Sequence, residues 1–367
     1  MTGTIHLGRN HPPMVAEVFD PEYLAAQDSV LRELPPSAIA GHHRWTGTAR
    51  DRAAGAKFAA LRLGTEPAPD RVIVTNGTQS ALLMLFAGLV GRGGVLLAEA
   101  LTYPPLMTFA RHFGFRIAGV AIDDHGMVPD ALEAAIRAEK PGAVYLVPTH
   151  QNPTTSIMPL SRREQIAQIA RHHGVAIIED DIYSLLTPDG PPPLSALAPE
   201  IGWHVLGTAK SIAAGMKIAY VTCPSAEAAR QHFWPGVRGT HWMATPMSAA
   251  IMTAMVEGGG AGRIMAAVGD EVRGRQVLAR ELLGNIPVTT QREALHLWFE
   301  LPPGMNRSAL AQRATEGGLV IGTSDEYIPD ETQAPEAVRI GIGNPASRDE
   351  LTVALTRFVD AYEGLRP

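Results

Sequence analysis

The sequence predicts an α/β protein: a three-layer αβα domain around a mostly parallel sheet, with a smaller α+β domain beside it. Between residues 71 and 224, short apolar β-rich runs alternate with helical patterns, which is typical of parallel strands joined by crossover helices. After residue 245 long helical patterns and a few strand-like runs follow instead. We expect the large domain to span 45–260 and the small domain to combine 1–44 with 261–367.

The composition excludes several classes of protein. The 367 residues are 46% hydrophobic and 19% charged, enough for two globular domains. A net charge of -6 argues against nucleic-acid binding. No apolar run reaches the ~18 residues of a membrane span, and residues 1–14 lack the pattern of a signal peptide. With one cysteine, Cys223, we expect a cytoplasmic protein without an intrachain disulfide.

The expected elements follow from the period of the apolar residues. Residues 1–40 are expected to be rich in loops, with one amphipathic stretch from Pro21 to Leu34. Helices are predicted at 49–63, 80–90, 103–114, 129–139, 161–174, 246–259, 262–284, 308–318 and 347–362. Strands are predicted at 71–77, 94–100, 115–122, 142–148, 175–180, 204–208, 218–224, 294–302, 318–323 and 339–343. A serine caps the start of the helix at 161–174, and a glycine ends it.

Polar residues gather where three predicted strands end: NGTQ at 76–79, THQNPT at 149–154 and EDDIY at 179–183. Ligands of parallel α/β sheets bind at this carboxyl edge. In NGTQSAL a glycine turn precedes a helix, where free N–H groups favour an anion such as phosphate. An ordinary capped helix is the alternative.

Lys210 lies in a glycine-rich, apolar stretch, LGTAKSIAAGMKIAY at 206–220. The chain has 31 Lys and Arg residues, of which only four are lysines, so arginine is used wherever a plain positive charge suffices. An amine can lose its proton and form a Schiff base, which a guanidinium cannot do. Lys210 is therefore a candidate for covalent chemistry, although a surface lysine before a strand would have the same pattern.

Further residues near these strand ends complete the pattern. Asp180 could hold a proton on a ring nitrogen, with Tyr183 facing the same pocket; a solvated acidic loop, or a metal site without convincing partners, is the alternative. Asn152 offers an amide, and Tyr103 at a helix start could stack on a planar ligand. Together with Lys210 and the anion site, they indicate a site for pyridoxal 5'-phosphate and no metal.

The motifs NGTQ, TYP, QNPT, EDDIY, the lysine run and a C-terminal arginine resemble those of fold-type I pyridoxal phosphate enzymes of aminotransferase class I/II. The resemblance covers nearly the whole chain and is closest to the aminotransferase-like domain of MocR-type proteins. It implies an aspartate aminotransferase-like fold. It also implies a homodimer with active sites at the subunit interface.

The resemblance implies a role for each matching residue. Lys210 would form the Schiff base and carry protons, Asp180 would bind the pyridine nitrogen, and Arg339 would bind the substrate carboxylate. For Arg339, a salt bridge within a strand is the alternative. The other implied contacts are Asn152 and Tyr183 on the phenolic oxygen, Asn152 beside the substrate, Tyr103 stacked on the ring as a catalytic residue, and Gly77, Thr78 and Gln79 on the phosphate.

The chain departs from the family around the expected phosphate site. Gly207 and Ala209 stand where serines are usual, and Lys217 stands where an arginine is usual. His42 aligns with the tyrosine that usually reaches the partner's phosphate. Thr208 is the candidate for a substitute hydroxyl, and Lys217 and His42 for the usual contacts. The loop histidines, any of which could act as an additional acid or base, are His11, His42, His43 and His150.

These residues predict an enzyme that acts on an amino acid, most simply an aminotransferase that forms a keto acid. The altered phosphate site leaves open β- or γ-elimination or replacement, or oxygen-dependent oxidation, in a specialised biosynthetic pathway. A non-catalytic effector-sensing domain is a third alternative, disfavoured because residues 1–40 lack a basic helix-turn-helix. A nicotinamide site is weaker still, because GRGG at 91–94 is not G-x-G-x-x-G.

Side-chain specificity is expected to come from three loops, at 8–13, 232–245 and 322–330. The second loop carries a cluster that could shape a pocket or a dimer contact: Trp234, Arg238, His241 and Trp242.

Overall fold

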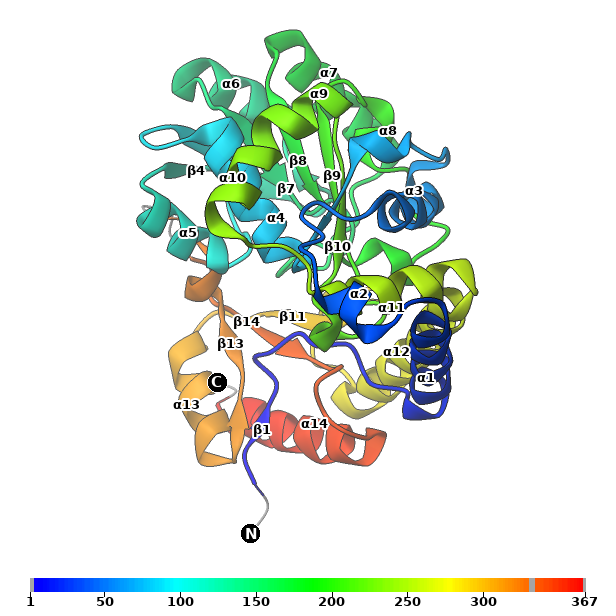
Figure 1. Cartoon of the computed structure of the whole chain (residues 1–367). Coiled ribbons are helices and arrows are strands. Elements are labelled where there is room, and N and C mark those ends of the chain that lie inside the picture. The colour runs from blue at the N-terminus through cyan, green and yellow to red at the C-terminus, as the bar shows by residue number, and fades with distance from the viewer. Residues whose placement is uncertain (1–2, 330–333, 366–367) are drawn as a thin grey trace.

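The computed structural model describes residues 3–329 and 334–365 and is organised around a seven-stranded sheet (Figure 1). Its strands lie in the order β2 (Val72–Thr75), β10 (Ala219–Thr222), β9 (Gly202–Gly207), β8 (Ala176–Asp180), β7 (Ala143–Leu146), β3 (Val95–Glu99) and β4 (Arg116–Val120). β10 is antiparallel to β2 and β9, and the pairs from β9 to β4 are parallel. The mostly parallel sheet is therefore confirmed.

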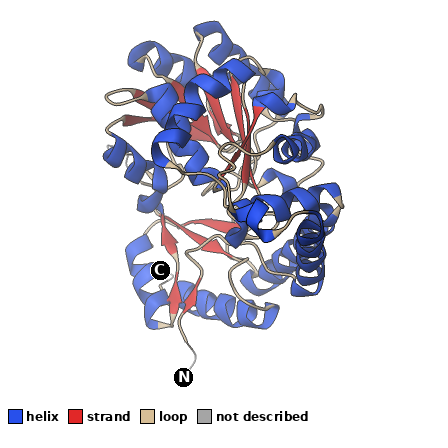
Figure 2. Cartoon of the chain, viewed as in Figure 1, coloured by secondary structure: helices blue, strands red, loops and turns tan. Residues whose placement is uncertain are grey.

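Successive side chains of the central strands point into two different cores, so helices cover both faces of the sheet. In β3, Leu96 belongs to the core on one face and Leu97 to the core on the other. The first core includes residues of α3 (Ala49–Leu63), α4 (Gly77–Leu85) and α5 (Pro105–Phe113). The second includes residues of α6 (Pro129–Glu139), α7 (Leu160–His173) and α8 (Leu194–Leu197). Figure 2 shows the resulting three-layer arrangement, as predicted.

A smaller three-stranded antiparallel sheet lies below the large one in Figure 1, in the order β11 (His296–Glu300), β14 (Ala337–Gly341), β13 (Gly322–Thr323). It shares a separate hydrophobic cluster with α13 (Arg307–Glu316) and α14 (Arg348–Glu363). The long helix α12 (Gly260–Leu283) contributes Val268 to the large core and Leu283 to this cluster. Near the N-terminus, β1 (Ile5–His6) pairs in parallel with β12 (Leu319–Val320).

The N-terminal region contains more helix than expected. α1 spans Ala16–Glu33 and α2 spans Pro36–Ala40. Pro21 lies inside α1, and the burial of Ala26 and Val30 offsets its cost to the helix. The predicted loop at 232–245 likewise contains α10 (Trp234–Thr240).

Two helix ends also differ from the prediction. α7 begins at Leu160 after Pro159 without a side-chain cap, so the predicted serine cap was wrong; its end at Gly174 is confirmed. The helix predicted at 80–90 divides into α4 and a π-helical turn at Phe86–Val90. The remaining strands and α-helices are the β5 (Ile122–Asp123) and β6 (Gly126–Met127) hairpin, α9 (Ala226–Ala228) and α11 (Pro246–Glu257). Across the described ranges, no helix is both long and apolar enough to cross a membrane.

Candidate active site

A cavity of about 250 Å³ lies at the carboxyl ends of β7 and β8, where the large sheet faces β14 and the N-terminal residues. The predicted site residues that line it are Thr78, Tyr103, Asn152, Asp180, Tyr183, Lys210 and Arg339. They come from segments far apart in the sequence. The sheet edge therefore brings together most of the residues that the motifs pointed to.

Asp180 ends β8 and lines the cavity. Its Oδ2 accepts a hydrogen bond from the Tyr145 hydroxyl at 2.9 Å, while its buried Oδ1 has no partner in the part of the chain that the structure describes. Burial raises the pKa of Asp180 to about 6, although the Tyr145 bond opposes this shift. A buried acceptor without a donor is costly unless a ligand supplies one.

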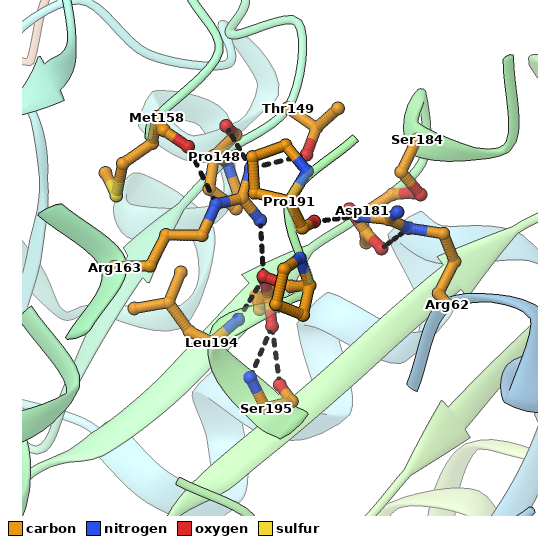
Figure 3. Close-up of polar contacts among 12 residues, drawn as sticks. Arg62, Pro148, Thr149, Met158, Arg163, Asp181, Ser184, Pro191, Leu194 and Ser195 are labelled. Atoms are coloured by element: carbon orange, nitrogen blue, oxygen red, sulfur yellow. Dashed lines mark hydrogen bonds and ion pairs between the residues drawn. The ribbon is translucent and has the colours of Figure 1, made fainter. Parts of the chain in front are cut away.

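The neighbours of Asp180 serve the fold instead, because strand residues alternate between faces. Glu179 accepts hydrogen bonds from the backbone N–H groups of Leu194 (2.8 Å) and Ser195 (2.7 Å) at the start of α8. Asp181 is buried against Arg62, whose Nε lies 3.0 Å from Oδ2 (Figure 3). Burial would raise the pKa of Asp181, but its His204 hydrogen bond and the Arg62 charge outweigh it and lower that pKa.

Lys210 follows β9 and is held at the cavity by the N-terminal segment. Its Nζ donates a hydrogen bond to the backbone carbonyl of Asn10. Burial lowers the pKa of Lys210 to about 8, helped by the positive charge of Arg339 and opposed by Asp180. About a tenth of this amine is therefore neutral at pH 7, in the form that a nucleophile or a base must have.

Arg339 projects from β14 into the same cavity. Its Nη1 donates to Oδ1 of Asn152 at 2.8 Å, and its Nη2 donates to the carbonyl of Gly8 at 2.6 Å. Its buried Nε has no partner among the described residues. The guanidinium carbon lies 5.1 Å from the centre of the Tyr327 ring, a cation–π arrangement. Arg339 is thus held in place by two hydrogen bonds, and its Nε–H is still available as a donor. Both of these bonds go to uncharged acceptors, which differs from the alternative of a salt bridge within the strand.

The loop that carries Asn152 is held by buried polar contacts. Gln151 donates to the carbonyl of Leu101 at 2.6 Å and accepts a hydrogen bond from the backbone N–H of Thr154 at 2.9 Å. The Asn152–Pro153 peptide bond is cis. Glu99 accepts a hydrogen bond from the backbone N–H of Val147 at 3.1 Å, and burial raises its pKa to about 8.

The expected phosphate residues lie at the start of α4. Gly77 begins this helix with φ 77, Thr78 lines the cavity, and the Gln79 amide donates to the Tyr103 hydroxyl at 3.0 Å. Lys217 lies beside Gly77: a Cβ added to Gly77 would be 3.7 Å from the Lys217 Cδ. The helix N-terminus and this lysine together form a positively polarised corner.

Other predicted residues lie elsewhere. The Thr208 hydroxyl donates to the carbonyl of Ile218 at 2.8 Å, so its proton is already committed. His42 is exposed and lies outside the cavity. His150, a candidate acid or base, is buried beside Thr187, and burial lowers its pKa to about 4.

Of the other predicted histidines, His11 lines the cavity, whereas His43 packs against the Trp45 ring at 5.1 Å. The cluster predicted in 232–245 also lies away from the cavity. Its Trp234 packs against Trp45, with 5.6 Å between the centres of the two rings. Asp330, the last residue of the third predicted specificity loop, lies outside the described residues.

The cavity residues that were not singled out from the sequence include Asn10, Tyr145 and Tyr327. Asn10 and Tyr327 belong to the predicted specificity loops 8–13 and 322–330. The sequence therefore indicates the right loops but not these two residues. Tyr145 carries the only polar side chain in the predicted apolar strand GAVYLVP, and that exception could have marked it.

Comparison with known proteins identifies the family of this chain. The model of "Aminotransferase class I and II" matches residues 24–358. The HTH-type transcriptional regulator YdeF of Bacillus subtilis (strain 168) is 26% identical over 306 residues, 82% of this chain and 65% of that protein. The 2-aminoadipate transaminase of Thermus thermophilus is 29% identical over 271 residues, 71% of this chain and 67% of that protein. The chain thus spans about two thirds of the length of these relatives.

Solved structures agree on the fold. An alpha-aminoadipate aminotransferase from Thermus thermophilus, solved with N-(5'-phosphopyridoxyl)-L-leucine, superposes with a TM-score of 0.86 at 23% identity, covering 99% of this chain and 93% of that one. A Pyrococcus horikoshii kynurenine aminotransferase gives a TM-score of 0.88 at 19% identity, covering 100% and 93%. Because the family model matches residues 24–358, which is most of this chain, the chain belongs to the aminotransferase class I and II family.

Proposed function

We propose that this chain is a pyridoxal 5'-phosphate-dependent aminotransferase that converts an amino acid to its keto acid. The observation that carries the proposal is that Lys210 and Asp180 line one cavity, and that Oδ1 of Asp180 has no hydrogen-bond partner among the described residues. A neutral amine suits a carbonyl carbon, and a buried carboxylate oxygen without a donor suits a protonated ring nitrogen. Family membership and the phosphopyridoxyl ligand of the Thermus structure support the same choice of cofactor.

The cavity residues fit this cofactor group by group. Asp180 would hold the pyridine nitrogen, Asn152 and Tyr183 the phenolic oxygen, and Tyr103 one face of the ring. The start of α4 would hold the phosphate through Gly77, Thr78 and Gln79, with Lys217 adding a positive charge. Thr208 and His42 stay candidates for further phosphate contacts, His42 in the partner's site. When bound, the cofactor supplies an electron-accepting ring that stabilises negative charge at the substrate Cα.

The chain's own groups would then bind the substrate and move its protons. Arg339 would grip the α-carboxylate with its guanidinium, whose Nε is still unpartnered among the described residues. The Lys210 amine, with a pKa lowered to about 8 by burial, would take the proton from Cα and return it to C4' of the cofactor. Asp180 would keep the ring nitrogen protonated, because its negative charge is buried and needs a positive partner.

The same proposal includes the assembly and the organisation of the chain. We propose a cytoplasmic homodimer with its active sites at the subunit interface, in which 45–260 form the large domain and 1–44 with 261–367 form the small one. The separate hydrophobic clusters around the large and small sheets support this division.

The test is to load the purified protein with the cofactor, reduce it with borohydride and locate the added mass. We expect the mass on Lys210, and none on a Lys210→Ala variant. Incubation with mixed amino acids and 2-oxoglutarate should then give keto acids rather than ammonia, peroxide or adducts. Ammonia or peroxide as the main product would favour elimination or oxidation instead. A protein that stays colourless and gains no mass would overturn the proposal.

A further inference from the structure

Asn10 joins the N-terminal segment to both sheets at the cavity wall. It is 8% exposed, and its Nδ2 lies 3.0 Å from the Tyr183 hydroxyl and 3.0 Å from Nδ1 of His296 on β11. Its backbone carbonyl accepts the hydrogen bond from Lys210. One residue of a loop thus contacts residues from three distant parts of the chain.

The hydrogen-bond directions in this group are fixed. The Nε2 of His296 lies 3.3 Å from the carbonyl oxygen of Gln151, which can only accept, so Nε2 carries the proton. His296 is neutral, because burial lowers its pKa well below the usual value. Its Nδ1 must therefore accept, and Asn10 must present its NH₂ group rather than its oxygen.

The consequence falls on Tyr183. Because Asn10 donates to the Tyr183 oxygen, the hydroxyl proton of Tyr183 must point elsewhere, and this hydroxyl donates no hydrogen bond to another described residue. Tyr183 lines the cavity, so its proton is directed to whatever acceptor binds there. An acceptor at position 10 would have the opposite effect, drawing that proton away from the cavity.

We propose that Asn10 is a positioning residue that sets Tyr183 as a hydrogen-bond donor to the phenolic oxygen of the bound cofactor. This inference rests on the proposed function. Donation to that oxygen stabilises its deprotonated form, so the visible absorption of the loaded protein changes with pH at a lower midpoint when Asn10 is present. The charged and titratable groups facing Tyr183 are Arg339, Asp180, Tyr103 and His296, and the variants below alter none of them.

The experiment is a spectrophotometric pH titration of the cofactor-loaded, full-length protein. Asn10→Ala should raise the midpoint by about half to one pH unit, the worth of one hydrogen bond. Asn10→Asp has the same shape but brings a carboxylate that accepts instead of donating and adds a negative charge, so it should raise the midpoint further. The matched control is Asn344→Ala, because the Asn344 amide donates to the carbonyl of His6 at 2.7 Å and its side chain also hydrogen-bonds His11, so it anchors the same segment without touching Tyr183. It should leave the midpoint unchanged.

The Tyr183→Phe background separates positioning from a general loosening of the loop. There, Asn10→Ala should cause no further shift, since the group on which it acts is gone. An equal shift in both backgrounds, or an equal shift in Asn344→Ala, would overturn the inference while leaving the proposed function intact. A parent protein without any visible band would overturn the proposed function and this inference together.

Discussion

The amine of Lys210 is buried near one positive charge, that of Arg339, and one negative charge, that of Asp180. Burial, with the charge of Arg339, lowers its pKa to about 8, against an ordinary value of about 10.4. Only the neutral amine attacks a carbonyl, so the rate of cofactor loading should rise with pH and level off above about pH 8. Visible absorbance after rapid mixing at a series of pH values measures this. A midpoint above about pH 10 would contradict the lowered pKa.

Asp180 should make the cofactor-free protein sensitive to pH. Burial raises its folded-state pKa to about 6, above the ordinary value of about 3.9. Its contribution to stability is therefore complete below about pH 4 and is lost as the pH rises through about 6. We expect cofactor-free Asp180→Asn to be more stable than the parent at about pH 7 by about 2 kcal/mol, and equally stable near pH 4. Urea unfolding at both pH values measures the difference, and a gap that does not change with pH would refute it.

Arg339 is expected to recognise a carboxylate by geometry as well as charge. Arg339→Lys keeps the charge but loses the planar fork that contacts Asn152 and Gly8. We expect KM for the amino acid to rise about 10- to 100-fold, with the visible band of the cofactor retained. Steady-state kinetics measures this, with Arg348→Lys, at an exposed ion pair with Glu271, as the control. Similar KM values for both variants would exclude the assigned role.

At the scale of the element, Asp180 at the end of β8 lines the site, whereas Asp181, the next residue, stabilises the fold. The Arg62–Asp181 pair is almost fully buried, so removing one partner leaves an uncompensated charge. Arg62→Met should lower the free energy of unfolding by about 3–5 kcal/mol. In contrast, Arg171→Met at the exposed pair with Glu200 should cost less than about 1 kcal/mol. Denaturant unfolding compares the two, and equal losses would mean that burial does not set the cost.

The sequence predicts strands and their ends better than it predicts loops. The alternation of apolar β-rich runs with helical patterns located β8 and the residues that follow it. Asp180 and Tyr183 could therefore be named in advance. Asn10 could not, because its position in the cavity depends on a segment that crosses to β11 and β14, and no local pattern encodes that crossing. The same limit applies to Thr208: its hydroxyl was available in the sequence, but the Ile218 carbonyl uses its proton.

At the scale of the whole molecule, the cavity exists because the N-terminal segment lies directly against β14. A Cβ at Gly341 would lie 2.1 Å from the carbonyl oxygen of Arg9, and one at Gly343 would lie 2.0 Å from that of His11. Neither approach is possible with a side chain present. The glycines of RIGIG therefore allow Gly8 and Asn10 to reach Arg339 and Lys210.

Gly341→Ala should consequently displace the segment and impair the site from a distance. Arg339 would lose its contact with the Gly8 carbonyl, so we expect KM for the amino acid to rise about 10-fold. Gly262→Ala is the matched control, because nothing lies within 4 Å of a Cβ added there. Its KM should equal that of the parent. If Gly341→Ala folds and also keeps the parental KM, the segment does not form a working wall of the substrate site, and the cavity depends on the two sheets alone.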